Sequence, residues 1–336
     1  MNYALKILIV AADKGNHFTP FIEEQIEALR QKGIVVERFG VRRKGAAGYI
    51  REIPRLYRTI RQVRPDIIHA HYGLSGLLAG MTASIYKFTN LQIHKVPPVV
   101  TTYHGSDINE PKVLRLSYFA MRLSAWNIFV SLRNVEIATK ACRITHYSLI
   151  PCGVNLTDDQ LLSRAEARRQ CTMPDAPCVL FAGAFDNAVK DADLAKKSIS
   201  VLNATIPVSE ENNRVHLIEL RGYSRSEVNR LMCAADCLLL TSLREGSPQV
   251  VKEAMACGCP IVSVDVGDVR ERIQDIDGCF VANTRSPQEL AGLLAKALQY
   301  KGKTSGRQYI VSHGLDNAHI ADRLIEIYRR ILNRRN

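Results

Sequence analysis

Short apolar runs alternate along the first half of the chain with amphipathic stretches that are long enough to be helices. The apolar runs are rich in Ile and Val and lie at residues 5–11, 34–39, 66–70, 99–103 and 127–130. Continuous apolar strands that are spaced by helices are typical of a parallel sheet covered on both faces. The hydrophobic pattern therefore predicts a βαβ domain in the first half.

The same alternation restarts in the second half, after a polar and irregular stretch that ends near Pro177. The strands expected there begin near Val179, Val215, Leu238 and Ile261. At 336 residues the chain suits two cores of roughly 150 residues each. We therefore expect an α/β protein with one Rossmann-like domain at residues 1–150 and a second at 151–316. An amphipathic helix at 317–332 is expected to pack back on the first domain.

The composition narrows the class of protein. Hydrophobic residues make up 46% and charged residues 23% of the chain, and no run of about 20 apolar residues occurs. These values exclude a disordered or fibrous protein and predict no membrane-spanning helix. The start of the sequence lacks the apolar core of a secretion signal, so we expect a cytoplasmic protein. The nine cysteines lack metal-finger spacing and are expected to be reduced thiols.

Positive charge is concentrated in the first half. The net charge is +12, and residues 1–150 hold 21 Lys and Arg against 10 Asp and Glu. A basic domain suggests an anionic partner such as a membrane surface, a lipid-linked diphosphate or nucleic acid. Arg51, Arg55, Arg58 and Arg61 recur at helical spacing on one predicted helix at residues 50–64. A solvated face is the favoured interpretation of these arginines, and contact with anionic lipid is the alternative. Residues 114–123 could also enter a membrane interface, but a helix that covers the first sheet is the favoured interpretation there.

The strongest chemical signal lies at residues 235–260. A buried strand is expected to end in a Glu245-Gly246-Ser247-Pro248 turn, and a helix then begins at Gln249. The N-terminus of a helix favours an anion such as phosphate, and glycine lets the backbone approach a ligand closely.

Two glutamates, Glu245 and Glu253, flank this turn eight positions apart. Carboxylates accept paired hydroxyl groups well, so both could contact one ligand of nucleotide-sugar size. Taken singly, Glu245 could be a solvated loop acid and Glu253 a residue that complements the helix dipole.

This stretch closely resembles the signature of the retaining GT-B glycosyltransferases of family 4, which carry a Glu, seven residues, Glu pattern in the same strand, turn and helix. The resemblance implies two Rossmann-like parallel-sheet domains that face a central cleft. It also implies that Glu245 faces the donor sugar and that Glu253 holds the ribose hydroxyls. The turn residues Gly246, Ser247, Pro248 and Gln249 would then contact the sugar or the phosphates.

Other segments extend the resemblance over most of the chain. Residues 179–190, with Gly183 and Lys190, look like the phosphate loop of the family. Residues 220–224, with Gly222 and Tyr223, look like its base-contacting turn. Residues 150–155 resemble the interdomain linker, and residues 66–73 and 103–107 resemble strand ends of the first domain.

The sequence also departs from the family. Ala184 and Phe185 occupy the position of an arginine that usually accompanies the phosphate-binding lysine. The glycine-rich first loop keeps only Gly15, and Lys14 is our candidate for a substitute cation.

The implied reaction is departure of a nucleoside diphosphate with retention at the anomeric carbon. Lys190 and the helix N-terminus would stabilise the leaving group electrostatically, and His104 resembles a histidine that contacts the donor sugar. A buried core histidine is an equally weighted interpretation of His104. His69 and His71 alternate on one strand, so we expect them to point to opposite faces and not to chelate one metal.

Two Asp-any-Asp pairs, Asp191 with Asp193 and Asp275 with Asp277, are too short a pattern to indicate a metal site. We therefore predict no metal and no cofactor. The expected partners are a UDP- or GDP-linked donor and a glycan or polyprenyl-diphosphate-linked acceptor of bacterial surface-polysaccharide synthesis, at the inner face of the membrane.

Three other functions compete with this hypothesis. A nucleotide-sugar-binding pseudoenzyme is favoured only by the missing arginine. Nucleic-acid binding is favoured only by the basic charge, because no reader motif is present. A dinucleotide-dependent dehydrogenase would need a glycine fingerprint that residues 11–17 do not supply.

Overall fold

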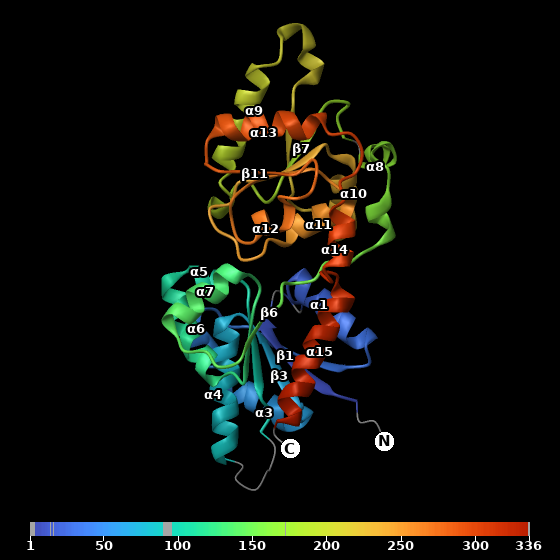
Figure 1. Cartoon of the computed structure of the whole chain (residues 1–336). Coiled ribbons are helices and arrows are strands. Elements are labelled where there is room, and N and C mark those ends of the chain that lie inside the picture. The colour runs from blue at the N-terminus through green and yellow to red at the C-terminus, as the bar shows by residue number, and fades with distance from the viewer. Residues whose placement is uncertain (1–3, 14, 16, 90–95, 172, 335–336) are drawn as a thin grey trace. The chain divides into compact units, whose positions relative to one another are not determined.

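The protein divides into two compact units. The computed structural model describes residues 4–13, 15, 17–89, 96–171 and 173–334. Unit 1 comprises Met1–Gly153 with Asn317–Asn336, and unit 2 comprises Val154–Asp316. Both units are parallel α/β sheets covered by helices, as the hydrophobic pattern predicts (Figure 1).

Unit 1 is built on a six-stranded parallel sheet in the order β2-β1-β3-β4-β5-β6. The strands are β1 Lys6–Ala12, β2 Val35–Val41, β3 Ile67–His71, β4 Val99–Tyr103, β5 Trp126–Phe129 and β6 Tyr147–Leu149. Every residue of β3 and β4 is buried, because helices cover both faces of the sheet.

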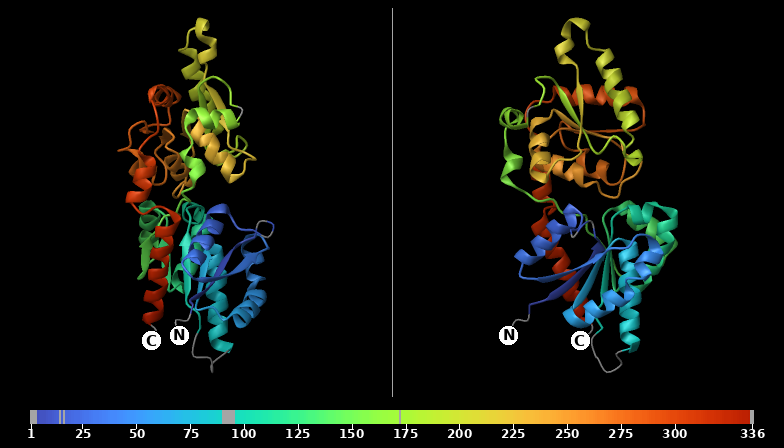
Figure 2. Two further views of the ribbon diagram at one scale, coloured as in Figure 1. Left: turned by 90° about the vertical axis from the view of Figure 1, so that its right-hand side faces the viewer. Right: turned by 180° about the vertical axis from the view of Figure 1, so that it is seen from behind.

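Alternate residues of β1 face different helices of unit 1. Ile7 and Ile9 pack with α1 (Pro20–Gln31) and α15 (Asn317–Asn333), which lie against each other. Leu8 and Val10 pack with α3 (Ile53–Val63) and α4 (Gly73–Thr89). In Figure 2 the red helix α15 runs beside this sheet. The remaining helices of the unit are α2 Gly45–Ile50, α5 Ser106–Asn109, α6 Pro111–Leu123 and α7 Leu132–Ala141.

The helix predicted at residues 50–64 is present as α3, but it starts three residues later than predicted. A separate short helix, α2, ends at Ile50, and α3 starts at Ile53 with Pro54 in the first turn, so Arg51 lies outside α3. Proline is favoured in the first turn of a helix, where its missing N–H breaks no hydrogen bond. Among the described residues, no helix is both long and apolar enough to cross a bilayer.

Unit 2 is built on a five-stranded parallel sheet in the order β11-β10-β9-β7-β8. Its strands are β7 Cys178–Phe181, β8 His216–Glu219, β9 Cys237–Leu240, β10 Ile261–Val264 and β11 Phe280–Ala282. Its α-helices are α8 Arg164–Cys171, α9 Ala192–Ala204, α10 Arg225–Ala234, α11 Gln249–Cys257, α12 Val269–Ile273, α13 Pro287–Gln299 and α14 Gly306–Ser312. Three short 3₁₀ helices are η1 Asp158–Leu161, η2 Ala188–Lys190 and η3 Val208–Asn213.

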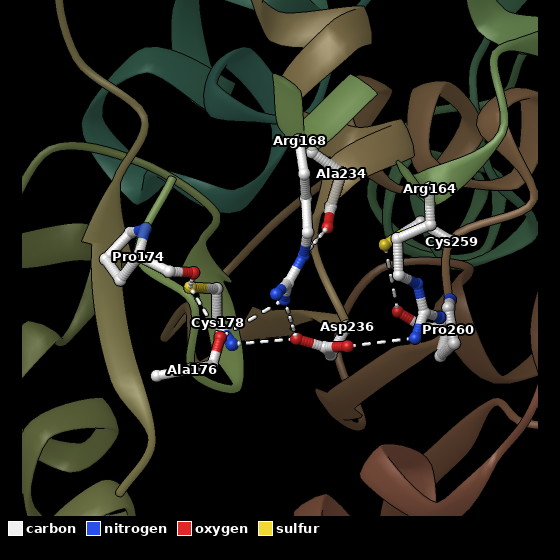
Figure 3. A network of polar contacts seen from close by, with 9 residues as sticks. All are labelled: Arg164, Arg168, Pro174, Ala176, Cys178, Ala234, Asp236, Cys259 and Pro260. Atoms are coloured by element: carbon white, nitrogen blue, oxygen red, sulfur yellow. Dashed lines mark hydrogen bonds and ion pairs between the residues drawn. The ribbon is translucent and has the colours of Figure 1, made fainter. Parts of the chain in front are cut away.

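Asp236 joins the strands of unit 2 at the amino edge of the sheet, where the strands begin (Figure 3). Its carboxylate accepts the backbone N–H of Cys178 at 2.8 Å and pairs with Arg168 at 2.6 Å and Arg164 at 2.9 Å. Arg168 also donates to the carbonyls of Ala234 and Ala176. One carboxylate thus ties β7, β9 and α8 together.

The sheet of unit 1 buries two histidines of β3. His69 bonds Tyr328 Oη at 2.6 Å and Thr102 Oγ1 at 2.8 Å, and its ring stacks on His71 at 4.7 Å. The expectation that these histidines face opposite sides is wrong, because residues two apart in a strand share a face. Burial lowers the pKa of His71 to about 3 and lowers that of His69 well below its usual value.

Replacing Asp236 with Ala is expected to destabilise the protein by about 2–3 kcal/mol, because two arginines lose a largely buried partner. The melting temperature should fall by roughly 5 °C or more. Replacing Asp186, whose pair with Arg221 is 60–65% exposed, serves as the control and should change it little. Equal melting temperatures for the two variants would contradict this role of Asp236.

Acid is expected to weaken the sheet of unit 1. The unfolded imidazoles take up protons below about pH 6.5, whereas buried His69 and His71 resist protonation, so the stability they contribute is lost as the pH falls from about 6.5 toward 3. Nearby Asp107 opposes this, since burial raises its pKa to about 6 and its contribution is lost as the pH rises. The stability lost through the two histidines at low pH is expected to exceed the stability gained through Asp107.

Hydrogen exchange of β3 peptides, corrected for the intrinsic rate, checks this expectation. Protection should be lower at pH 5 than at pH 7, and His71→Gln should reduce the difference. Protection in the wild type that does not change with pH would contradict it.

Candidate functional site

The predicted turn after β9 lies at the carboxyl edge of the sheet of unit 2, where its strands end. Every residue of β9 is buried, residues 241–248 form the loop, and α11 begins at Gln249. Pro248 is the residue before the helix, and its side chain cannot accept a capping bond from the first turn. Gly246 is buried and lies close to Gly267: a Cβ at Gly267 would come within 2.7 Å of the carbonyl oxygen of Gly246.

Lys190 and Glu245 meet at this edge. Lys190 ends η2, which follows β7, and its Nζ lies 2.7 Å from Glu245 Oε1. Both side chains are about one-fifth exposed, so solvent and ligands can reach the pair. A Cβ at Gly183 would lie 2.7 Å from Lys190 Cγ, and the lack of a side chain at Gly183 therefore leaves room for the lysine stem.

Glu253 lies one turn into α11 and is nearly buried, with 5% of its surface exposed. Its Oε1 pairs with Arg225 at 2.5 Å. Arg225 is the first residue of α10, and a Ser224–Glu227 capping box fixes the start of that helix. The loop immediately before it holds Gly222, whose φ is +80°, and Tyr223, which is 45% exposed.

Arg225 is a site residue that the sequence reasoning missed. The capping box is a local signal and could have placed Arg225 at the start of a helix. Its pairing with Glu253, 28 residues away, has no such local signal.

Ser247 belongs to a polar network behind the turn. Its hydroxyl donates to Asp268 Oδ2 at 2.8 Å and accepts from buried Lys252 at 3.3 Å. Arg272 donates to the same Asp268 oxygen at 3.0 Å. The network orients the turn, and Lys252 and Asp268 are therefore further residues that the sequence reasoning did not single out.

Arg285 fixes the first residues of this loop. It donates to the carbonyls of Thr241 and Ser242 at 2.6 and 2.9 Å and pairs with Asp191 at 2.6 Å. Asp191 also caps α9 by accepting the N–H of Leu194. Asp191 is thus engaged in capping and pairing. Within the described part of the chain, no cluster of three or more His, Cys, Asp or Glu side chains has the arrangement of a metal site.

His104 follows β4 in unit 1. Its Nε2 lies 3.0 Å from His71 Nδ1, its Nδ1 lies 3.4 Å from Cys152 Sγ, and its ring packs against Phe21 and Tyr72. Asp107 accepts the backbone N–H of His104 at 2.9 Å and so holds this loop in place. The histidine is half-buried, which suits either interpretation given above.

Of the two residues predicted in the first loop, the structure places one. Gly15 is exposed with φ of +80°. Lys14 lies outside the described residues.

Two family models match consecutive parts of the chain. The model described as Glycosyltransferase Family 4 matches residues 8–158, and the model described as Glycosyl transferases group 1 matches residues 176–300. The first falls almost entirely within unit 1, and the second lies within unit 2.

Curated relatives share about a quarter of the aligned residues. A candidate teichuronic acid biosynthesis glycosyltransferase, TuaC of Bacillus subtilis (strain 168), is 25% identical over 225 residues, which are 62% of this chain and 55% of TuaC. A D-inositol 3-phosphate glycosyltransferase of Mycolicibacterium gilvum (strain PYR-GCK) is 25% identical over 301 residues, which are 80% of this chain and 66% of that protein. The chain thus spans between half and two thirds of the length of these relatives.

Solved structures match nearly the whole chain. Sucrose-phosphate synthase from Thermosynechococcus elongatus has a TM-score of 0.72 at 17% identity and covers 98% of this chain and 99% of its own. Anabaena Alr3699/HepE in complex with UDP has a TM-score of 0.69 at 19% identity and covers 97% of this chain and 100% of its own. These likenesses show the GT-B fold. With the Glu245–Glu253 turn in the predicted strand, loop and helix and with both family models matched in order, the chain belongs to the family 4, group 1 glycosyltransferases.

Proposed function

We propose that this protein transfers a sugar, with retention and without a metal, from a nucleoside-diphosphate sugar to a hydroxyl acceptor. The observation that carries the proposal is the pairing of Glu253 with Arg225 and of Glu245 with Lys190, beside the start of α11 at one edge of the sheet. Carboxyl edges of parallel sheets are the usual ligand sites of such folds.

Glu253 is proposed to bind the ribose of the donor. A carboxylate offers about four lone-pair sites, so it can keep Arg225 and still accept two hydroxyl groups. Because Glu253 is already largely desolvated, nucleotide binding costs little further desolvation of this group.

Lys190 and the first amides of α11 are proposed to stabilise the leaving diphosphate. As the bond between the anomeric carbon and the phosphate oxygen breaks, negative charge grows on that oxygen and positive charge on the sugar ring. Lys190 is favourably placed for the first charge and Glu245 for the second. The acceptor hydroxyl would attack from the face that the diphosphate leaves and would pass its proton to the departing phosphate oxygen. Positive charge from the protein would thus serve in place of a metal ion.

UDP is the favoured nucleotide. Anabaena Alr3699/HepE was solved with UDP and with UDP-glucose, and its fold matches this chain. The named role of TuaC in teichuronic acid biosynthesis supports an acceptor in bacterial surface-polysaccharide synthesis.

We also propose that unit 1 binds an anionic membrane surface through α6. This helix exposes Phe119 (58%) and Leu123 (39%) beside exposed Arg115 and Arg122. Aromatic and basic side chains on one helix suit a lipid interface.

The arginines that recur at helical spacing between residues 51 and 61 suit membrane binding less well than α6 does. Arg55 pairs with buried Glu52 and lies over the ring of Phe39 at 3.9 Å. Its guanidinium group is therefore engaged in contacts within unit 1. Arg58 and Arg61 remain exposed on α3.

A pseudoenzyme is the second candidate, because Ala184 stands where the family has an arginine. It would bind the donor but neither hydrolyse nor transfer it. Turnover of the nucleotide sugar with and without a glycan acceptor separates the two functions.

The Glu253→Gln variant should bind UDP at least ~10-fold more weakly than the wild type, since a neutral amide accepts the ribose hydroxyls less well. Calorimetry with UDP, GDP and ADP measures this effect. Glu211→Gln removes an exposed glutamate of the same unit and should bind like the wild type. If no nucleotide binds the wild type, or if Glu253→Gln binds equally well, the proposed donor site is wrong.

Arg115→Glu with Arg122→Glu should reduce binding to vesicles of phosphatidylcholine and phosphatidylglycerol by ~10-fold or more, since each juxtamembrane charge contributes about 1 kcal/mol. Co-sedimentation with these vesicles measures it. The matched control is Arg58→Glu with Arg61→Glu, which changes the net charge of the protein by the same amount but on α3. An equal loss in both double variants would show that net charge, not α6, governs binding; no binding of the wild type would exclude membrane association under these conditions.

A further inference from the structure

The segments that follow β4 and β6 bring a thiol and an imidazole together in unit 1. Cys152 Sγ lies 3.4 Å from His104 Nδ1, and both side chains are partly exposed. The other ring nitrogen of His104, Nε2, lies 3.0 Å from Nδ1 of buried His71. A thiol, an imidazole and a third group that orients the imidazole are the usual parts of an activated nucleophile.

Gln25 sets the direction of the hydrogen bonds in this cluster. Its side-chain Nε2 lies 3.4 Å from His71 Nε2, and an amide nitrogen can only donate. Burial lowers the pKa of His71 to about 3, so the ring is neutral at pH 7 and carries its one proton on Nδ1. His71 therefore donates to His104 Nε2, and His104 carries its own proton on Nδ1 and donates it to the sulfur of Cys152.

The imidazole of His104 is held in this orientation. Its ring centroid lies 4.9 Å from that of Phe21 and 4.5 Å from that of Tyr72. Asp107 accepts the backbone N–H groups of His104 and Gly105, each at 2.9 Å. An N–H that already points at a sulfur stabilises the thiolate, and the ring does not need to reorient when the thiol loses its proton.

The other eight cysteines have different surroundings. Cys171 is also partly exposed, but burial raises the pKa of its thiol. The remaining seven are buried. The sulfur of Cys178 lies 3.3 Å from the carbonyl oxygen of Ala176, and that of Cys237 lies 3.3 Å from the carbonyl oxygen of Leu238. A carbonyl oxygen beside a sulfur favours the neutral thiol, because it repels negative charge.

We propose that Cys152 is a reactive thiol that forms mixed disulfides with low-molecular-weight disulfides such as oxidised glutathione. The thiol releases its proton to water, and the thiolate that remains accepts the N–H of His104. Its sulfur attacks one sulfur of the small disulfide, the S–S bond breaks, and the departing thiolate takes up a proton from water. One disulfide is consumed and one is formed, so no further oxidant is needed.

A group attached to Cys152 would lie against His104. The family resemblance implies that this histidine contacts the donor sugar, so formation of the mixed disulfide should lower the rate of sugar transfer. The proposed contacts of the nucleotide belong to unit 2, so UDP binding should change little. This consequence rests on the proposed function, whereas the reactivity of the thiol does not.

Incubation of the full chain with oxidised glutathione at pH 7, followed by peptide mapping with mass spectrometry, tests the site. One glutathione should be added at Cys152 at least ~10-fold faster than at Cys171, and dithiothreitol should remove it. Urea separates the imidazole from the thiol. The rate at Cys152 should therefore be lower in urea than in the folded protein, although unfolding exposes the sulfur.

Two variants of His104 separate the effect of its N–H from the effect of access to the sulfur. His104→Ala removes the donor and should slow the reaction of Cys152 several-fold, although it opens a path to the thiol. His104→Asn keeps an N–H near the place of Nδ1 and should retain part of the rate. His216→Ala removes an exposed histidine of unit 2 and, as the matched control, should react like the wild type.

The mapping experiment also shows when the proposal is wrong. It is overturned if Cys152 forms no adduct, if Cys171 reacts as fast as Cys152, or if unfolding in urea does not slow Cys152. These three results come from the wild type and do not depend on the folding of a variant. Wild-type rates in both His104 variants, with unchanged circular dichroism, would overturn it as well.

Turnover of the nucleotide sugar before and after complete modification of Cys152 tests the consequence for function. A several-fold lower rate, restored by dithiothreitol, supports this consequence, and an unchanged rate overturns it. If the reduced protein turns over no nucleotide sugar, the proposed transferase function fails, while the mapping result for Cys152 still stands.

Discussion

Charge pairing at the two edges of the second sheet is the constraint on which the rest of unit 2 depends. A carboxylate that is withdrawn from water needs a cation or several N–H donors to remain charged. At the amino edge Asp236 meets this need with two arginines and a backbone N–H of β7. At the carboxyl edge Glu253 and Glu245 meet it with Arg225 and Lys190.

Charge pairs serve a different purpose at each of the two edges of the sheet. The pairs of Asp236 include the backbone of a strand, so they cannot separate without opening the sheet. The pairs of Glu253 and Glu245 join side chains from loops and helix starts, so their partners can be shared or exchanged while the sheet stays intact. Under the proposed function, a diphosphate would replace a carboxylate beside Lys190 at little cost in desolvation, because the lysine is already partly withdrawn from water.

Much of this arrangement could be predicted from local sequence, and the limits have a physical reason. The strands and the turn at Glu245 follow from hydrophobic runs and turn residues that lie within one segment. Arg225 and Asp268 could not be found that way, because each is placed by a partner more than 15 residues distant along the chain.

One error of prediction was local and avoidable. Residues two apart in a strand share a face, so His69 and His71 had to lie together. The loop at Phe185 lacks the arginine that is usual in the family. Glu219 accepts the backbone N–H of Phe185, and the Phe185 ring packs on Phe181 and lies under Lys196. The loop is held by packing and one hydrogen bond and adds no cation at this position. Under the proposed mechanism, Lys190 and the start of α11 would supply the positive potential for the leaving diphosphate. Because a site with fewer cations stabilises the transition state less, the proposal implies slow turnover.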